Sequence, residues 1–159
     1  MALCSILLSA LCAVLWYRHA LRPLLAEGRL ERVVVALAAD DDHWAHIEQR
    51  LARRQPEFAH RLLRCVGGEN RQASVLAGLE ALAGMASPDD WILVHDAARP
   101  CLGAADLCRL LDALPGTHGA LLAVPVSDTL KRMGAGTLAT VDRAGLWRAL
   151  TPQAFRFAA

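Results

Sequence analysis

The sequence RVVVAL at residues 32–37 is a short β-branched run with charges on either side. Such a run is typical of a strand that is buried on both faces, as the strands of a parallel sheet are. Three aspartates at residues 40–42 follow it, and then Trp44, Ile47 and Leu51 recur at helical spacing. This region therefore predicts a buried strand followed by a capped amphipathic helix.

The same alternation continues toward the C-terminus. Short apolar runs predict further strands at residues 64–66, 91–94 and 120–124. The segments between these runs predict two helices, with the apolar positions Val75, Leu76, Leu79 and Leu82 ending at Gly84, and Leu107, Leu110, Leu111 and Leu114 ending before Pro115. The order predicts an α/β fold with a mostly parallel sheet and helices on both faces, which binds ligands beyond the carboxyl ends of its strands.

Two parts of the chain depart from this alternation. Residues 2–17 carry no charge, and we interpret them as the start of a buried helix that runs on to Leu25. Membrane association is the alternative for residues 2–17, and a misassigned start or an upstream frameshift is a further alternative for the first dozen residues. We separate residues 1–13 from a domain at 14–159. Residues 127–151 are polar and rich in turn residues, and they predict an extended, hairpin-like excursion.

The composition limits the partners. Seventeen basic and sixteen acidic residues leave a net charge of +1, so nothing favours a nucleic-acid surface and a small molecule is the more natural ligand. All basic residues except Lys131 are arginines, whose forked guanidinium groups suit phosphate. The five cysteines show no metal-binding or redox spacing, which is consistent with a reducing, cytoplasmic location.

A glycine pair introduces the first candidate site, GGENRQAS at residues 67–74. Gly67 and Gly68 stand between a predicted strand and a predicted helix, where backbone can approach a ligand and the helix N-terminus favours an anion. The alternative is a tight turn in which Ser74 is an ordinary polar residue.

The second candidate site is HDAARP at residues 95–100. Asp96 directly follows an apolar strand, a position at which a carboxylate can hold Mg²⁺ beside a polyphosphate, and Ala97 leaves room for a ligand. Arg99 can pair with phosphate or with Asp96 itself. His95 is more often structural than catalytic at such a strand end.

Two further segments, PVSDTLKR at residues 125–132 and TVDRAGLWRALTPQ at 140–153, add hydroxyl groups and cations. Solvated surface charge is the alternative for Lys131 and Arg132. All four segments are expected on one rim of the sheet.

In their order and spacing, the four segments resemble the 2-C-methyl-D-erythritol 4-phosphate cytidylyltransferase family, above all in HDAARP combined with GLWRALTPQ. The resemblance implies a Rossmann-like nucleotidyltransferase fold. It also implies an enzyme that joins CTP to 2-C-methyl-D-erythritol 4-phosphate with release of pyrophosphate, uses Mg²⁺, and forms a homodimer through an arm at residues 127–151. Ribitol-5-phosphate cytidylyltransferase shares this plan and is the alternative enzyme.

The resemblance also assigns roles to residues. Asp96 would lie near Mg²⁺ and the α-phosphate, and Arg143 would act on the site of a second subunit. The nucleotide would contact Gly67, Gly68, Glu69, Ser74, Asp96 and Ala97; the sugar-alcohol phosphate would contact Thr129, Arg143 and Thr151; and the catalytic residues would be Arg143, Thr151 and Arg99.

The chain departs from the family pattern near both of its ends. The family begins with a strand and a glycine-rich loop that wraps the triphosphate, whereas residues 1–13 contain neither a glycine nor a basic residue. The family also continues past the T-P-Q segment to a strand with a further lysine. We therefore expect a truncated chain with negligible catalysis of its own, or a catalytically dead module that binds nucleotide or dimerises.

Overall fold

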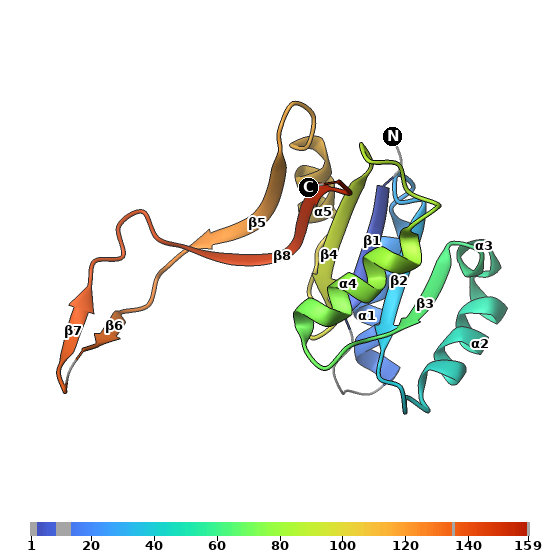
Figure 1. Cartoon of the computed structure of the whole chain (residues 1–159), viewed down its shortest axis with the longest axis horizontal. Helices are drawn as coiled ribbons and strands as arrows, with labels where there is room; N and C mark the ends of the chain where they lie inside the picture. The colour runs from blue at the N-terminus through green and yellow to red at the C-terminus, as the bar shows by residue number, and fades with distance from the viewer. Residues whose placement is uncertain (1–2, 9–13, 135, 159) are drawn as a thin grey trace.

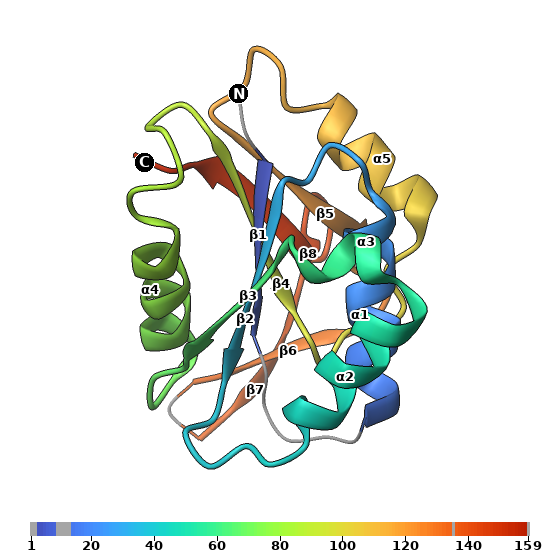
Figure 2. The ribbon, with the colours of Figure 1, turned by 90° about the vertical axis from the view of Figure 1, so that its right-hand side faces the viewer.

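The protein is built on a six-stranded sheet with the strand order β3-β2-β1-β4-β8-β5, and a two-stranded hairpin projects from it (Figure 1). The computed structural model describes residues 3–8, 14–134 and 136–158, and it describes side chains from residue 19 onward. The prediction of an α/β fold with helices on both faces of the sheet is confirmed (Figure 2).

Four parallel strands form one side of the sheet. They are β1 (Leu3–Leu8), β2 (Arg32–Leu37), β3 (Leu62–Val66) and β4 (Trp91–Asp96). β1 pairs with β2 on one side and with β4 on the other, so it lies in the middle of the sheet. The expected helix over residues 2–17 is therefore wrong for its first part, because an uncharged, mainly apolar run fits a strand buried on both faces as well as a buried helix.

Helices cover both faces of the sheet. Four of them lie on one side, namely α1 (Val14–Ala26), α2 (Trp44–Arg54), α3 (Pro56–Ala59) and α5 (Ala104–Asp112), and α4 (Arg71–Leu82) covers the other. Alternate residues of β2 point to opposite faces of the sheet. Val33 and Val35 pack in the core on the side of α1, α2 and α5, and Val34 packs in the core on the side of α4. The predicted helix extending to Leu25 is confirmed from Val14 onward. No helix within the described ranges has the length and hydropathy that a membrane span requires.

The last strand, β8 (Trp147–Arg156), runs antiparallel between β4 and β5 (Gly119–Pro125). The sequence did not predict this strand, because its polar and apolar residues follow no regular alternation. Its place depends on pairing with two strands that are distant in the chain. β8 brings Thr151 beside the end of β4.

The excursion expected at residues 127–151 is present as a hairpin on two long connections, but it ends before Trp147, because residues 147–151 belong to β8 (Figure 1). Its strands are β6 (Leu130–Met133) and β7 (Leu138–Val141). We call residues 127–146 the arm. Its side chains are nearly all exposed, and Met133 is 71% and Leu138 63% accessible. The arm therefore has no core of its own.

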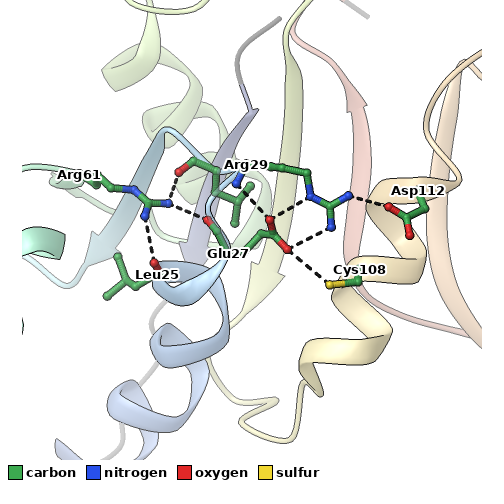
Figure 3. A network of polar contacts seen from close by, with 7 residues as sticks. Leu25, Glu27, Arg29, Arg61, Cys108 and Asp112 are labelled. Atoms are coloured by element: carbon green, nitrogen blue, oxygen red, sulfur yellow. Dashed lines mark hydrogen bonds and ion pairs between the residues drawn. The ribbon is translucent and has the colours of Figure 1, made fainter.

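A polar network fastens the helices at the opposite end of the strands (Figure 3). The guanidinium of Arg61 donates to backbone carbonyls around the end of α1, including that of Leu25 at 3.0 Å. The carboxylate of Glu27 accepts from Arg29, and Arg29 reaches Asp112 at the end of α5 at 2.6 Å. Arg29 holds the pKa of Glu27 at about 2, well below its ordinary value. This network joins α1, α5 and the start of β3.

Candidate active site

Three of the four predicted segments meet at the carboxyl edge of the parallel strands. The 67–74 segment follows β3, Asp96 ends β4 beside Leu8 of β1, and Thr151 lies on the adjacent strand β8. The strand order reverses between β1 and β4, and open α/β sheets bind their ligands at such a reversal. The fold thus puts these segments where a ligand site is expected.

The glycine pair lies against the first turn of α4. A Cβ atom on Gly68 would lie 2.3 Å from the Cβ of Ala73, so only glycine allows this close approach. The hydroxyl of Ser74 accepts from the N–H of Gly68 at 3.1 Å and donates to the carbonyl of Asn70 at 2.9 Å. Asn70 caps the helix by accepting from the N–H of Ala73. Ser74 is therefore the residue that fastens this turn to the helix.

Asp96 stands between two arginines. Its Oδ1 atom lies 3.1 Å from Nε of Arg71, and its Oδ2 atom lies 3.2 Å from Nε of Arg99. The Asp96 side chain is 25% exposed, whereas those of Arg71 and Arg99 are about half exposed. The pair of Asp96 and Arg99 expected from HDAARP is present. Two cations around one carboxylate, next to a helix N-terminus, make this edge locally positive.

Sequence reasoning missed Arg71. A signal was available, because a cation at the first residue of a helix opposes the helix dipole, which favours acidic side chains there. Which residue it pairs with could not be predicted, since Asp96 is 25 positions away in the chain.

His95 and Thr151 fix the backbone of Asp96. His95 is fully buried, and Thr151 is 7% exposed. Nε2 of His95 lies 3.1 Å from the carbonyl of Arg99, which can only accept, so Nε2 carries the proton and Nδ1 is an acceptor. The Thr151 hydroxyl then donates to Nδ1 at 2.9 Å and accepts from the N–H of Asp96 at 3.3 Å.

Burial lowers the pKa of His95, which agrees with this neutral form. The interpretation of His95 as a structural residue fits its position. Thr151, in turn, is a hydroxyl whose donor and acceptor are both engaged within the protein.

The remaining predicted residues are not gathered at Asp96 within one chain. Thr129 and Arg143 lie on the arm, where Arg143 donates to the carbonyl of Ser127. Lys131 donates to the hydroxyl of Thr140 at 2.7 Å across the hairpin. Glu69 is exposed and makes no polar side-chain contact with any described residue.

The donor set at Asp96 suits one kind of cation. In the described part of the chain, no three His, Cys, Asp or Glu side chains gather as a metal cluster. Mg²⁺ is commonly held by one or two carboxylates together with waters and phosphate oxygens, and a single carboxylate fits that chemistry. A zinc site, which needs three or four protein ligands, does not fit here.

Among the hollows on the described surface, two differ in their relation to the predicted site residues. A cleft of about 600 Å³ adjoins the site and is lined by Arg99, Asp106, Leu121, Thr151 and their neighbours. Another, of about 250 Å³, lies between α1 and α2 and is lined by none of the predicted site residues. Of these two, only the first is lined by predicted site residues, Arg99 and Thr151.

The comparison with known families accounts for this arrangement. Residues 10–159 match the model of the 2-C-methyl-D-erythritol 4-phosphate cytidylyltransferase family. The chain belongs to this family. The family named from the four motifs is thereby confirmed.

Curated 2-C-methyl-D-erythritol 4-phosphate cytidylyltransferases are close in sequence. The protein from Halorhodospira halophila is 49% identical over 140 residues, which are 86% of this chain and 55% of the relative. The protein from Thiobacillus denitrificans is 46% identical over 145 residues, or 87% of this chain and 60% of the relative. The chain thus spans a little over half the length of these relatives. Their names favour the methylerythritol enzyme over the ribitol-5-phosphate alternative.

Solved cytidylyltransferase structures share the fold. A crystal structure of 4-diphosphocytidyl-2C-methyl-D-erythritol synthase is 32% identical with a TM-score of 0.82, covering 99% of this chain and 76% of that one. The 2-C-methyl-D-erythritol 4-phosphate cytidylyltransferase from Thermus thermophilus is 27% identical with a TM-score of 0.66, covering 96% and 70%. The Rossmann-like nucleotidyltransferase fold expected from the motifs is therefore confirmed.

Proposed function

We propose that this chain carries the site of a cytidylyltransferase, which joins CTP to 2-C-methyl-D-erythritol 4-phosphate and releases pyrophosphate. The observation that carries the proposal is the placement of Asp96. It lies at the reversal of the strand order, between Arg71 and Arg99, and next to the N-terminus of α4. Membership of the family supports the choice of these two substrates.

The nucleotide side of the site lies on the body. The glycine turn at Gly67 and Gly68, with Glu69, Ser74 and Ala97, would contact the base and ribose of CTP. Asp96 would hold Mg²⁺ together with phosphate oxygens. When bound, the cation would neutralise charge on the triphosphate.

The acceptor side uses the arm. Thr129 and Arg143 would contact the sugar-alcohol phosphate, with Thr151 and Arg99 on the body. Because the arm leaves its own body, we propose that it crosses to a second copy in a homodimer, so that Arg143 acts on the partner's site. The exposed apolar residues Met133, Leu138 and Trp147 would be covered in that dimer.

The main contributions of the protein to this reaction would be to position the two substrates and to neutralise their charge. A phosphate oxygen of the acceptor attacks the α-phosphorus of CTP in line, and the bond from that phosphorus to the pyrophosphate oxygen breaks. Arg99 and the partner's cations would align the two phosphates and oppose their repulsion.

The test measures CTP binding by calorimetry and pyrophosphate release with 2-C-methyl-D-erythritol 4-phosphate and Mg²⁺. We expect CTP to bind, and we expect Asp96→Ala to weaken binding by at least about tenfold. Asp89→Asn, which alters an exposed carboxylate away from the site, is the matched control.

If the folded protein binds no CTP, the proposal is wrong. Binding of CTP without any release would favour the catalytically dead nucleotide-binding module. Faster release with ribitol 5-phosphate than with the methylerythritol substrate would point to the alternative enzyme.

A further inference from the structure

Arg71 occupies an unfavourable position for a cation. It is the first residue of α4, directly after the cap residue Asn70, where the helix dipole repels positive charge. Its side chain is half exposed, and within the described part of the molecule its only polar side-chain contact is with Asp96. The charge of Arg71 is therefore not stabilised by its own helix, and its partner Asp96 lies on another element, at the end of β4.

The two arginines at Asp96 are not equivalent. Arg99 belongs to the same loop as Asp96, its N–H donates to the carbonyl of Asp96 at 2.9 Å, and its own carbonyl accepts from His95. Arg71 comes from another element and is attached to Asp96 through its side chain alone. Release of the Arg71 side chain therefore frees Arg71 from Asp96 altogether, whereas Arg99 stays next to Asp96 through the backbone even when its side chain leaves.

Both carboxylate oxygens of Asp96 are occupied by guanidinium groups. Each oxygen still has a lone pair for a cation, but a cation bound there would lie close to a guanidinium group of the same charge, and releasing one pair removes that repulsion. A half-exposed ion pair is weak, so the exchange has a low cost. Phosphate is a stronger partner for the released guanidinium, because charge-assisted bonds to phosphate are short and bidentate.

We propose that Arg71 alternates between two partners. In the free protein it neutralises Asp96 and disfavours cation binding there, and when cation and triphosphate arrive together it moves from Asp96 to the phosphates. The proposal rests on the proposed nucleotide site, and it adds Arg71 as a residue that makes metal and triphosphate binding interdependent.

The experiment compares wild type with Arg71→Gln using two probes that need no turnover. The first is Mn²⁺ alone, followed by the electron paramagnetic resonance signal of the free ion. The second is inorganic triphosphate with Mg²⁺, followed by calorimetry. We expect Arg71→Gln to bind Mn²⁺ about three- to tenfold more tightly and triphosphate about tenfold more weakly.

Opposite changes with the two probes distinguish this role from a structural one, which would weaken both. Arg50→Gln removes the same charge from an exposed site on α2 and should leave both affinities unchanged within about twofold. Arg71→Lys keeps the charge without the fork, and should leave Mn²⁺ affinity near that of wild type. If Arg71→Gln leaves Mn²⁺ affinity unchanged or lowers it, or leaves triphosphate affinity unchanged, the inference is overturned.

The probes also separate this inference from the proposed function. Inorganic triphosphate carries no cytidine, so the exchange can be observed even if the site is not a CTP site. Wild type that binds CTP no better than inorganic triphosphate, with the opposite changes intact, would count against the proposed function and support the role of Arg71.

Discussion

Predicted site residues lie both at the carboxyl edge of the main sheet, which we call the rim, and on the arm. The two regions differ in how firmly the fold holds these residues. At the rim, Thr151 and His95 are buried and each polar atom has a partner, so the backbone of Asp96 is held in one position. On the arm, Thr129 and Arg143 are exposed, and among the described strands β6 and β7 pair only with each other. The rim is therefore preorganised within the chain, whereas the arm is not.

The largest expected effect concerns the buried pair at the rim. His95→Phe leaves the Thr151 hydroxyl and the Arg99 carbonyl without their partner, and we expect the free energy of unfolding to fall by about 3 kcal/mol. Urea denaturation measures this change. Thr151→Val removes one hydroxyl at nearly constant volume, and the double variant should show a coupling energy of about 1 kcal/mol. Additive effects of the two changes would mean that the pair does not act as a unit.

The glycine turn should come next. Gly68→Ala forces a methyl group toward Ala73, and we expect it to lower the free energy of unfolding by about 2 kcal/mol and to weaken CTP binding. Thermal denaturation and calorimetry report the two effects. Gly28→Ala is the matched control, because a Cβ atom there meets nothing within 4 Å. Equal effects of both substitutions would contradict the role of close packing at Gly68.

A smaller and pH-dependent effect belongs to Glu27, at the opposite end of the strands. Its pKa is about 2 in the folded protein, well below its ordinary value of 4.5, so the ionised form stabilises the fold. We expect Glu27→Gln to lower the free energy of unfolding at pH 7 by about 1 kcal/mol.

The sign of this pH dependence is fixed by the lowered pKa. The contribution is complete above pH 4.5 and disappears as the pH falls toward 2, so wild type and variant should converge in acid. Urea denaturation at pH 7 and pH 3 measures the convergence. A constant difference between the two proteins would show that Glu27 acts through packing instead of charge.

The smallest effect is expected on the arm. Met133→Ser changes a side chain that is 71% exposed, and the unfolding free energy of the monomer should change by less than about 0.5 kcal/mol. Denaturation at low protein concentration tests this. If the arm is covered by a second copy, the same variant should weaken association in sedimentation experiments. A large loss of monomer stability would mean that the arm packs on its own body.

Prediction from the sequence succeeded where local pattern is sufficient. Residues 32–37, residues 91–94 and the apolar stripe of Leu107 and Leu110 have spacings that only a buried strand or an amphipathic helix explains. It failed at residues 3–8, because a mainly apolar run with a single serine carries no clear period. It also failed at β8, whose pairing is long-range.

The sequence by itself determined the alternating α/β order, the four motif segments and, through them, the family. Only the tertiary structure decided that the Arg71 side chain pairs with Asp96 and that the Thr151 hydroxyl donates to Nδ1 of His95. It also decided that the arm, with Thr129 and Arg143, lies apart from these residues. Periodicity is set by neighbours along the chain, which a sequence contains. Side-chain partners depend on which strands lie next to each other, and strand order is fixed only when the whole sheet buries its apolar faces.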